Sequence, residues 1–180
     1  QDVETDDSVL RQTSARLPWL LIGMLGGIGN SMILGNFDTT FAAHPEMALY
    51  IPLIGGTGGN VGTQSSALVV QGLANSSLDA NNTWKQILKE SVVALINATI
   101  ISMLVYIYNF VRFGATATVS YSVSLSLFAV VMFASIFGTL VPMTLEKLKI
   151  DPAIATGPFI SITNDIIGML LYMSITVMIE

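Results

Sequence analysis

Five long apolar segments, joined by short polar connections, constrain the fold of this chain more than any other feature. A helix that crosses a membrane needs about 20 consecutive, mostly apolar residues. The segments extend over residues 17–37, 47–74, 91–111, 121–145 and 153–179. Only 11% of the residues are charged, whereas soluble domains contain about 25%. The sequence therefore predicts an all-α membrane protein with five transmembrane helices per chain.

The basic residues indicate how these helices are oriented. Six of the seven precede the first segment or lie in the second or fourth connection: Arg11, Arg16, Lys85, Lys89, Lys147 and Lys149. Only Arg112 falls on the other side. Loops rich in Lys and Arg usually face the cytoplasm. We therefore expect the N-terminus in the cytoplasm and the C-terminus, at Glu180, outside, in a multi-pass protein of the cell membrane (the inner or plasma membrane).

Asp165 is the one ionisable side chain deep inside an apolar segment. A carboxylate at that depth costs about 2.5–3.5 kcal/mol on insertion scales, so such residues usually face water, an ion or a partner. It belongs to a stripe at helical spacing, which consists of Gly157, Ser161, Asp165, Gly168 and Tyr172. Alternatively, Asp165 pairs with an amide or hydroxyl for helix association, as Asn164 on another face is expected to do. Pro158 is expected to kink or open this helix.

The second segment is unusually rich in glycine and polar residues. Residues 50–66 contain five glycines together with Asn60 and Gln64. A smooth strip at helical spacing is formed by Gly55, Gly59, Gly62 and Ser66. Small residues allow membrane helices to approach closely, so packing alone is one interpretation. The amides of Asn60 and Gln64 must be satisfied inside the membrane, which favours a cavity whose lining includes backbone carbonyls as oxygen ligands.

A single carboxylate per chain supplies too little charge for a dehydrated divalent cation. Two copies around a two-fold axis supply two charges, and symmetric dimers are the commonest oligomers. Five helices also leave little room for an internal pore. We therefore expect a symmetric homodimer in the lipid bilayer, with a pore at the dimer axis lined by the second and fifth segments.

The available ligand atoms are oxygens of carboxylate, hydroxyl, amide and backbone groups. The chain has no cysteine and a single histidine, His44, in an outer loop. Oxygen ligands suit Mg²⁺, Ca²⁺ and Mn²⁺ rather than Zn²⁺ or Cu²⁺. No nucleophile–base pair is apparent, so we expect no enzymatic activity. We also expect no nucleic-acid partner and no small organic substrate.

Three motifs resemble the MgtE family of magnesium channels and transporters. Residues 16–23 read Arg-Leu-Pro-Trp-Leu-Leu-Ile-Gly, and residues 52–64 read Pro-Leu-Ile-Gly-Gly-Thr-Gly-Gly-Asn-Val-Gly-Thr-Gln. Residues 151–165 begin Asp-Pro-Ala and end Asn-Asp. The resemblance extends from Arg16 to the C-terminus, in order and with the family's spacing.

The resemblance implies a homodimer with a central Mg²⁺ pore, with Mn²⁺ or Ca²⁺ as alternative ions. It implies that Asp165 holds a largely hydrated Mg²⁺ ion. The residues that would border this ion are Gly59, Thr63 and Ser161. Gly157 would lie at the cytoplasmic gate, and Asn60 and Gln64 are expected to line the pore.

Two positions depart from the pattern of some family members, which carry Asn in place of Thr63 and of Gly157. A hydroxyl in place of an amide at Thr63 is expected to change how hydration water is held. Residues 1–15 resemble the end of a cytoplasmic linker, and residues 16–180 a five-helix pore domain. We expect the given residues to lack the family's regulatory N and CBS domains, and a chain that starts at Gln1 is expected to be a fragment or a processed form.

Two rival functions remain open from the sequence. A proton- or Na⁺-coupled divalent cation exchanger would use Asp165 as a protonatable carrier, although exchangers commonly contain paired repeats with broken helices. A structural subunit of a membrane complex would not depend on Asp165 for ion flux. Glu90 has two interpretations, as an ordinary acid in the first turn of a helix or as a vestibule acid that attracts cations.

Overall fold

The computed structural model describes residues 3–114 and 116–179 and is helical throughout its regular elements. The five long helices are α1 (Val9–Gly35), α3 (Ile51–Ala74), α4 (Thr83–Phe113), α5 (Thr118–Lys147) and α6 (Pro158–Ile179). The short helical segments are α2 (Asp38–Ala43), η1 (Pro45–Tyr50), η2 (Ala80–Asn82) and η3 (Pro152–Thr156). No strand occurs within the described ranges, in agreement with the predicted all-α class.

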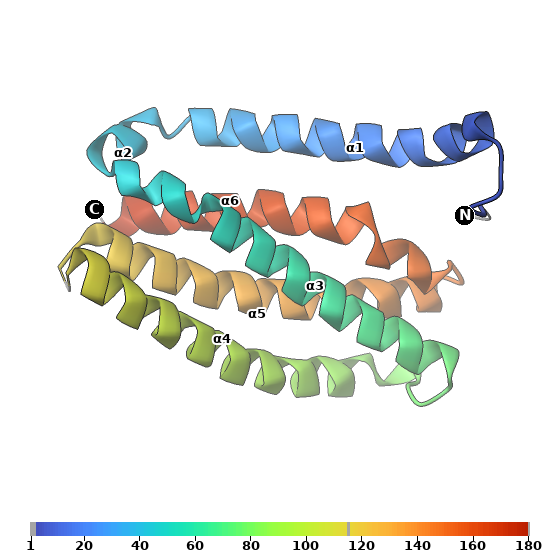
Figure 1. Cartoon of the computed structure of the whole chain (residues 1–180). Coiled ribbons are helices and arrows are strands. Elements are labelled where there is room, and N and C mark those ends of the chain that lie inside the picture. The colour runs from blue at the N-terminus through green and yellow to red at the C-terminus, as the bar shows by residue number, and fades with distance from the viewer. Residues whose placement is uncertain (1–2, 115, 180) are drawn as a thin grey trace.

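The long helices alternate in direction, and α3 crosses α6 and α5 obliquely (Figure 1). The start of α1 and the end of α6 lie at opposite ends of the bundle. Helix α5 is the central element and contributes more buried residues than any other described helix. Its apolar residues pack with η1, α3 and α6 around Met47 and Tyr172. The Tyr172 hydroxyl donates a hydrogen bond to the Met47 carbonyl at 2.8 Å. This contact fixes the end of α6 against η1.

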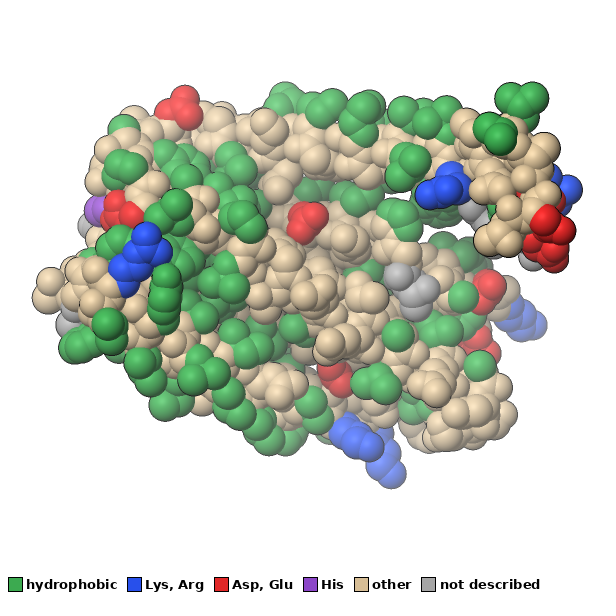
Figure 2. All heavy atoms as spheres, viewed as in Figure 1, with side chains coloured by type: hydrophobic (Ala, Val, Ile, Leu, Met, Phe, Trp, Pro, Cys, Tyr) green, Lys and Arg blue, Asp and Glu red, His purple; other side chains and the backbone are tan. Residues whose placement is uncertain are grey.

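Within the described residues, four helices are long and apolar enough to cross a membrane, namely α1, α4, α5 and α6. The fifth long helix, α3, does not meet the same hydropathy criterion, because glycine and polar residues such as Asn60 and Gln64 lower its mean hydropathy. On the face shown in Figure 2, Lys and Arg side chains lie toward the ends of the helices, and the middle is mostly hydrophobic or uncharged. This distribution suits a multi-pass membrane protein.

Helix α3 runs without a break despite its glycines. An irregular backbone, which would offer its carbonyls as ligands, is therefore not observed. The glycines instead permit close approach, since a Cβ atom on Gly138 of α5 would lie 2.6 Å from the Gly62 carbonyl oxygen. The residues of the predicted smooth strip lie in two environments. Gly62 and Ser66 are buried toward the neighbouring helices, while Gly55 and Gly59 are only partly buried.

Helix α6 begins at Pro158 and not at residue 153, as the apolar segment had suggested. Pro158 therefore starts the helix and does not kink it, because a proline in the first turn lacks only an N–H group that has no intrahelical partner. The preceding residues form η3, whose first turn is capped by Asp151, with the Ala153 N–H donating to Asp151 Oδ1 at 3.0 Å.

Helix α1 begins earlier than the predicted first segment. Ser8 caps it, accepting a hydrogen bond from the Arg11 N–H at 3.3 Å. The predicted boundary between residues 15 and 16 therefore lies inside a continuous helix. None of the residues of α1 is buried. The helix lies along α6, where a Cβ atom on Gly26 would lie 2.5 Å from Ile162 Cγ2. The predicted location of Glu180 concerns a residue outside the described ranges.

Candidate functional site

An open hollow of about 490 Å³ lies between α3 and α6. Its lining consists of Gly55, Gly56, Gly59, Asn60, Thr63 and Gln64 from α3, and Ser161 and Asp165 from α6. Every residue that the sequence suggested as an ion contact or as a pore-lining amide lies here. Helical spacing explains the grouping, because residues three or four apart share a face of an α-helix.

Asp165 lies half-buried in the wall of this hollow. Within the part of the chain that the structure describes, its carboxylate forms no hydrogen bond or ion pair. The absence of a side chain at Gly55 makes room for it, since a Cβ atom there would lie 3.1 Å from Asp165 Oδ1. Both carboxylate oxygens are thus free to bind a cation or the water around it.

The other side chains of the hollow add neutral oxygen atoms. Ser161 is exposed on α6, and a Cβ atom on Gly59 would lie 3.8 Å from its hydroxyl oxygen. Asn60, Thr63 and Gln64 are exposed along α3. Carboxylate, hydroxyl and amide oxygens are the ligands that hard cations such as Mg²⁺ and Ca²⁺ prefer. The hollow therefore offers one negative charge and several dipoles to an ion that retains part of its hydration shell.

Gly157, the expected gate residue, does not line this hollow. It lies between η3 and α6 and lines a separate hollow of about 480 Å³ near Arg16, Trp19 and Asp151. A Cβ atom on Gly157 would meet nothing within 4 Å. This position is therefore sterically open to a side chain.

Glu90, the possible vestibule acid, is also elsewhere. Its carboxylate accepts a hydrogen bond from the Ser65 hydroxyl at 2.7 Å, which joins α4 to α3. Ser65 is buried and does not belong to the hollow. Since α4 begins at Thr83, Glu90 lies about two turns inside the helix, so its interpretation as a first-turn acid is wrong.

The predicted stripe on α6 extends into two environments. Ser161 and Asp165 line the hollow, but Gly168 and Tyr172 are buried in the core. Sequence reasoning missed Gly56, which lines the hollow. Its signal was present, because Gly56 lies one turn before Asn60, which itself lies one turn before Gln64.

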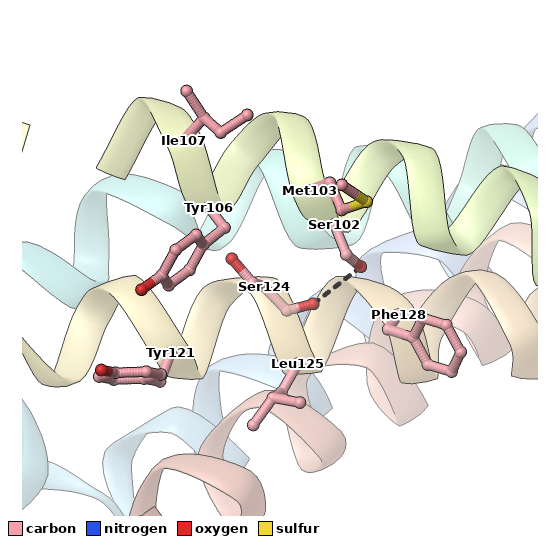
Figure 3. Close-up of a pocket in the computed structure, with 8 residues that line it drawn as sticks. All are labelled: Ser102, Met103, Tyr106, Ile107, Tyr121, Ser124, Leu125 and Phe128. Carbon is pink, nitrogen blue, oxygen red and sulfur yellow. Dashed lines mark hydrogen bonds between the residues drawn. The ribbon is translucent and has the colours of Figure 1, made fainter. Parts of the chain in front are cut away.

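A third hollow, of about 340 Å³, lies between α4 and α5 (Figure 3). It is lined by Ser102, Met103, Tyr106, Ile107, Tyr121, Ser124, Leu125 and Phe128. The Ser102 hydroxyl donates a hydrogen bond to the Ser124 carbonyl at 3.0 Å. With no carboxylate or amide side chain in its lining, this hollow lacks the chemistry of a cation site. Among the described residues, no group of three or more His, Cys, Asp or Glu side chains could hold a metal ion.

Comparisons with known proteins point to one family. The MgtE family model, described as a divalent cation transporter, matches residues 51–175. The magnesium transporter MgtE of Bacillus subtilis is 31% identical over 175 residues, which are 97% of this chain and 39% of that protein. That of Thermus thermophilus is 34% identical over 161 residues, 89% of this chain and 35% of that protein. That of Enterococcus faecalis is 30% identical over 175 residues, which are 97% of this chain and 38% of that protein. The chain thus spans less than two fifths of each of these relatives.

Proposed function

Because this chain belongs to the MgtE family of divalent cation transporters, we propose that it forms the ion-conducting part of a Mg²⁺ transport protein in the cell membrane. The family carries out transport, not enzymatic catalysis. The observation that carries the proposal is the position of Asp165, a half-buried carboxylate in an open hollow between α3 and α6. Most of the polar side chains around it belong to α3, which is not among the four described helices that are long and apolar enough to cross a membrane.

The proposed pore lies at the axis of a symmetric homodimer. A hollow that opens on the surface of one chain becomes an enclosed path when a second copy covers it. In this arrangement α3 and α6 of both copies line the path, and the two Asp165 carboxylates supply two negative charges. The pair balances the charge of one divalent cation, which the single carboxylate of one chain does not.

The proposed ion is a largely hydrated Mg²⁺. Mg²⁺ gives up its water reluctantly, so the side chains contact it mainly through water. Asp165 provides charge, and Gly59, Thr63 and Ser161 border the ion. Asn60 and Gln64, also on α3, line the same path. Gly157, at the start of α6, is proposed as the cytoplasmic gate. Mn²⁺ and Ca²⁺ are the competing ions that this set of oxygens would also accept.

The test is ion flux through the purified chain in liposomes under an imposed membrane potential. Asp165→Asn keeps the size of the side chain and removes its charge. A contact with a charged group contributes about 1.5–3 kcal/mol, so Mg²⁺ flux should fall roughly tenfold to hundredfold. Asp38→Asn is the matched control, because Asp38 is exposed in α2 and lies outside the hollow.

Three outcomes separate the interpretations. Loss of flux in Asp165→Asn but not in Asp38→Asn supports the ion site. Equal flux in both variants contradicts it and favours a structural role for the chain. Flux that requires a proton or Na⁺ gradient and does not respond to voltage identifies the coupled exchanger.

A further inference from the structure

Asn164, the neighbour of Asp165, is buried in the interior of the bundle. Its side chain is 1% exposed. Neither of its side-chain polar atoms forms a hydrogen bond with the residues that the structure describes. Sequence reasoning interpreted Asn164 as a residue that joins helices by hydrogen bonding. The structure shows no such hydrogen bond, and it places the side chain where Gly58 and Gly62 carry none.

The space that Asn164 occupies is a notch in α3. Gly58 and Gly62 lie one helical turn apart and present no side chains there. A Cβ atom on Gly62 would come well inside contact distance of Asn164 Nδ2 and would lie 2.9 Å from Ile160 Cγ2. A Cβ atom on Gly58 would lie 3.8 Å from Asn164 Cβ. The notch is therefore filled by the amide side chain.

Consecutive residues of an α-helix point about 100° apart around its axis. Seating Asn164 in the notch therefore fixes the direction of Asp165. We propose that Asn164 is a positioning residue for the cation site: its side chain, wedged against Gly58 and Gly62, sets the rotation of α6 and so holds Asp165 in the hollow. This inference rests on the proposed function, because it assigns Asn164 to the site formed by Asp165.

The absence of cysteine from the chain allows a direct test of helix rotation, because one introduced thiol is the only thiol present. Ser161→Cys places it in the hollow, and Ile160→Cys places it at a fully buried neighbouring position. A charged methanethiosulfonate reagent should modify Ser161→Cys at least about tenfold faster, since buried thiols are inert. The ratio of the two rates measures which face of α6 meets water. Gly56→Cys on α3 serves as a control for access to the hollow.

Two single variants disturb the notch in opposite ways. Gly62→Ala adds a methyl group where Asn164 sits, and Asn164→Ala leaves the notch unfilled. Each should lower the ratio of rates severalfold and reduce the protection of Ser161→Cys by Mg²⁺. The double variant Gly62→Ala/Asn164→Ala removes the clash between the new methyl group and the amide and leaves only its contact with Ile160 Cγ2. It should therefore raise the ratio back toward that of the parent. Labelling of Gly56→Cys should not change in any of these backgrounds.

A purely structural role for Asn164 would lower the unfolding temperature of the single variants in detergent but leave the ratio unchanged, and that result overturns the proposal. If Gly62→Ala does not fold, Asn164→Ala still tests it, because that change adds no atoms. Loss of the ratio in the variants without any Mg²⁺ protection in the parent supports the positioning role and overturns the proposed ion site. If Mg²⁺ protects Ser161→Cys in the parent but the ratio is unchanged in the variants, the ion site is supported and the positioning role is overturned.

Discussion

Gly55 and Gly56 are adjacent glycines in the same hollow, yet a methyl group would meet different surroundings at each. At Gly55 it would lie 3.1 Å from Asp165 Oδ1, which is closer than an ordinary van der Waals contact. At Gly56 it would meet nothing within 4 Å. The pair therefore separates the position of the carboxylate from the general effect of replacing a glycine in α3.

Gly55→Ala should weaken Mg²⁺ binding roughly tenfold, or about 1.4 kcal/mol, because the carboxylate must move to admit the methyl group. Gly56→Ala is the matched control and should bind Mg²⁺ like the parent. Isothermal titration of both purified variants measures the difference. If Mg²⁺ binding is weakened equally in the two variants, the cause is the volume of the hollow or the helix itself, and not a displacement of Asp165.

The sequence identified many of these residues because each carries a strong local signal. A carboxylate in an apolar segment is costly, and amides at helical spacing within a glycine-rich segment are conspicuous. Asn164 was harder to interpret, because the sequence is the same whether the side chain of this amide faces an ion path or a neighbouring helix. Its orientation depends on the notch at Gly58 and Gly62, and a one-dimensional pattern does not show which helix lies opposite.

At the scale of helices, the crossing of α3 and α5 depends on contact between two glycines. A Cβ atom on Gly138 would lie 2.6 Å from the Gly62 carbonyl oxygen and 3.2 Å from its Cα atom. These are backbone atoms, so the neighbouring group cannot rotate away as a flexible side chain can. The two helices must separate if Gly138 acquires a side chain.

Gly138→Ala should therefore destabilise the fold by about 1–3 kcal/mol, the usual cost of overpacking. The control is Gly29→Ala in α1, where a Cβ atom would meet nothing within 4 Å. This control should be neutral or slightly stabilising, since alanine favours a helix over glycine by about 1 kcal/mol. Thermal unfolding in detergent compares the two. A normal unfolding temperature for Gly138→Ala would mean that the crossing can widen without cost.

The lengths of the apolar segments predicted the long helices but not their ends. Segment boundaries were drawn where apolar character changes, whereas α1 and α4 continue through polar residues to Val9 and Thr83. The opposite occurred at α6, where apolar residues begin in η3 before the helix itself starts at Pro158. Caps, prolines and 3₁₀ turns set these limits, and the hydropathy of a segment is insensitive to them.

At the scale of the whole molecule, the proposed dimer brings the two hollows together. Gly56→Cys should join two copies through a short thiol-specific crosslinker, because Gly56 lines the hollow between α3 and α6. Leu125→Cys is the control, since Leu125 lines a different hollow, between α4 and α5 (Figure 3). Gel electrophoresis after crosslinking in membranes measures both. Dimers of Leu125→Cys without dimers of Gly56→Cys would place the contact between copies at α4 and α5, and would contradict the proposed dimer.

Helix α1 buries none of its residues within the chain, although Leu34 packs against the core. Among the glycines of α1, Gly26 is the one whose added Cβ atom would clash, and it would do so with Ile162. A saturation mutagenesis scan of this helix measures which positions tolerate substitution, and so reports which of them are in contact with other groups. Substitutions of Gly26 and Leu34 should be poorly tolerated because of their contacts within the chain. Exchange of one apolar residue for another at the exposed positions of α1 should not disturb those contacts. An intolerant position among the exposed residues of α1 would mark where lipid or another polypeptide touches the protein from outside.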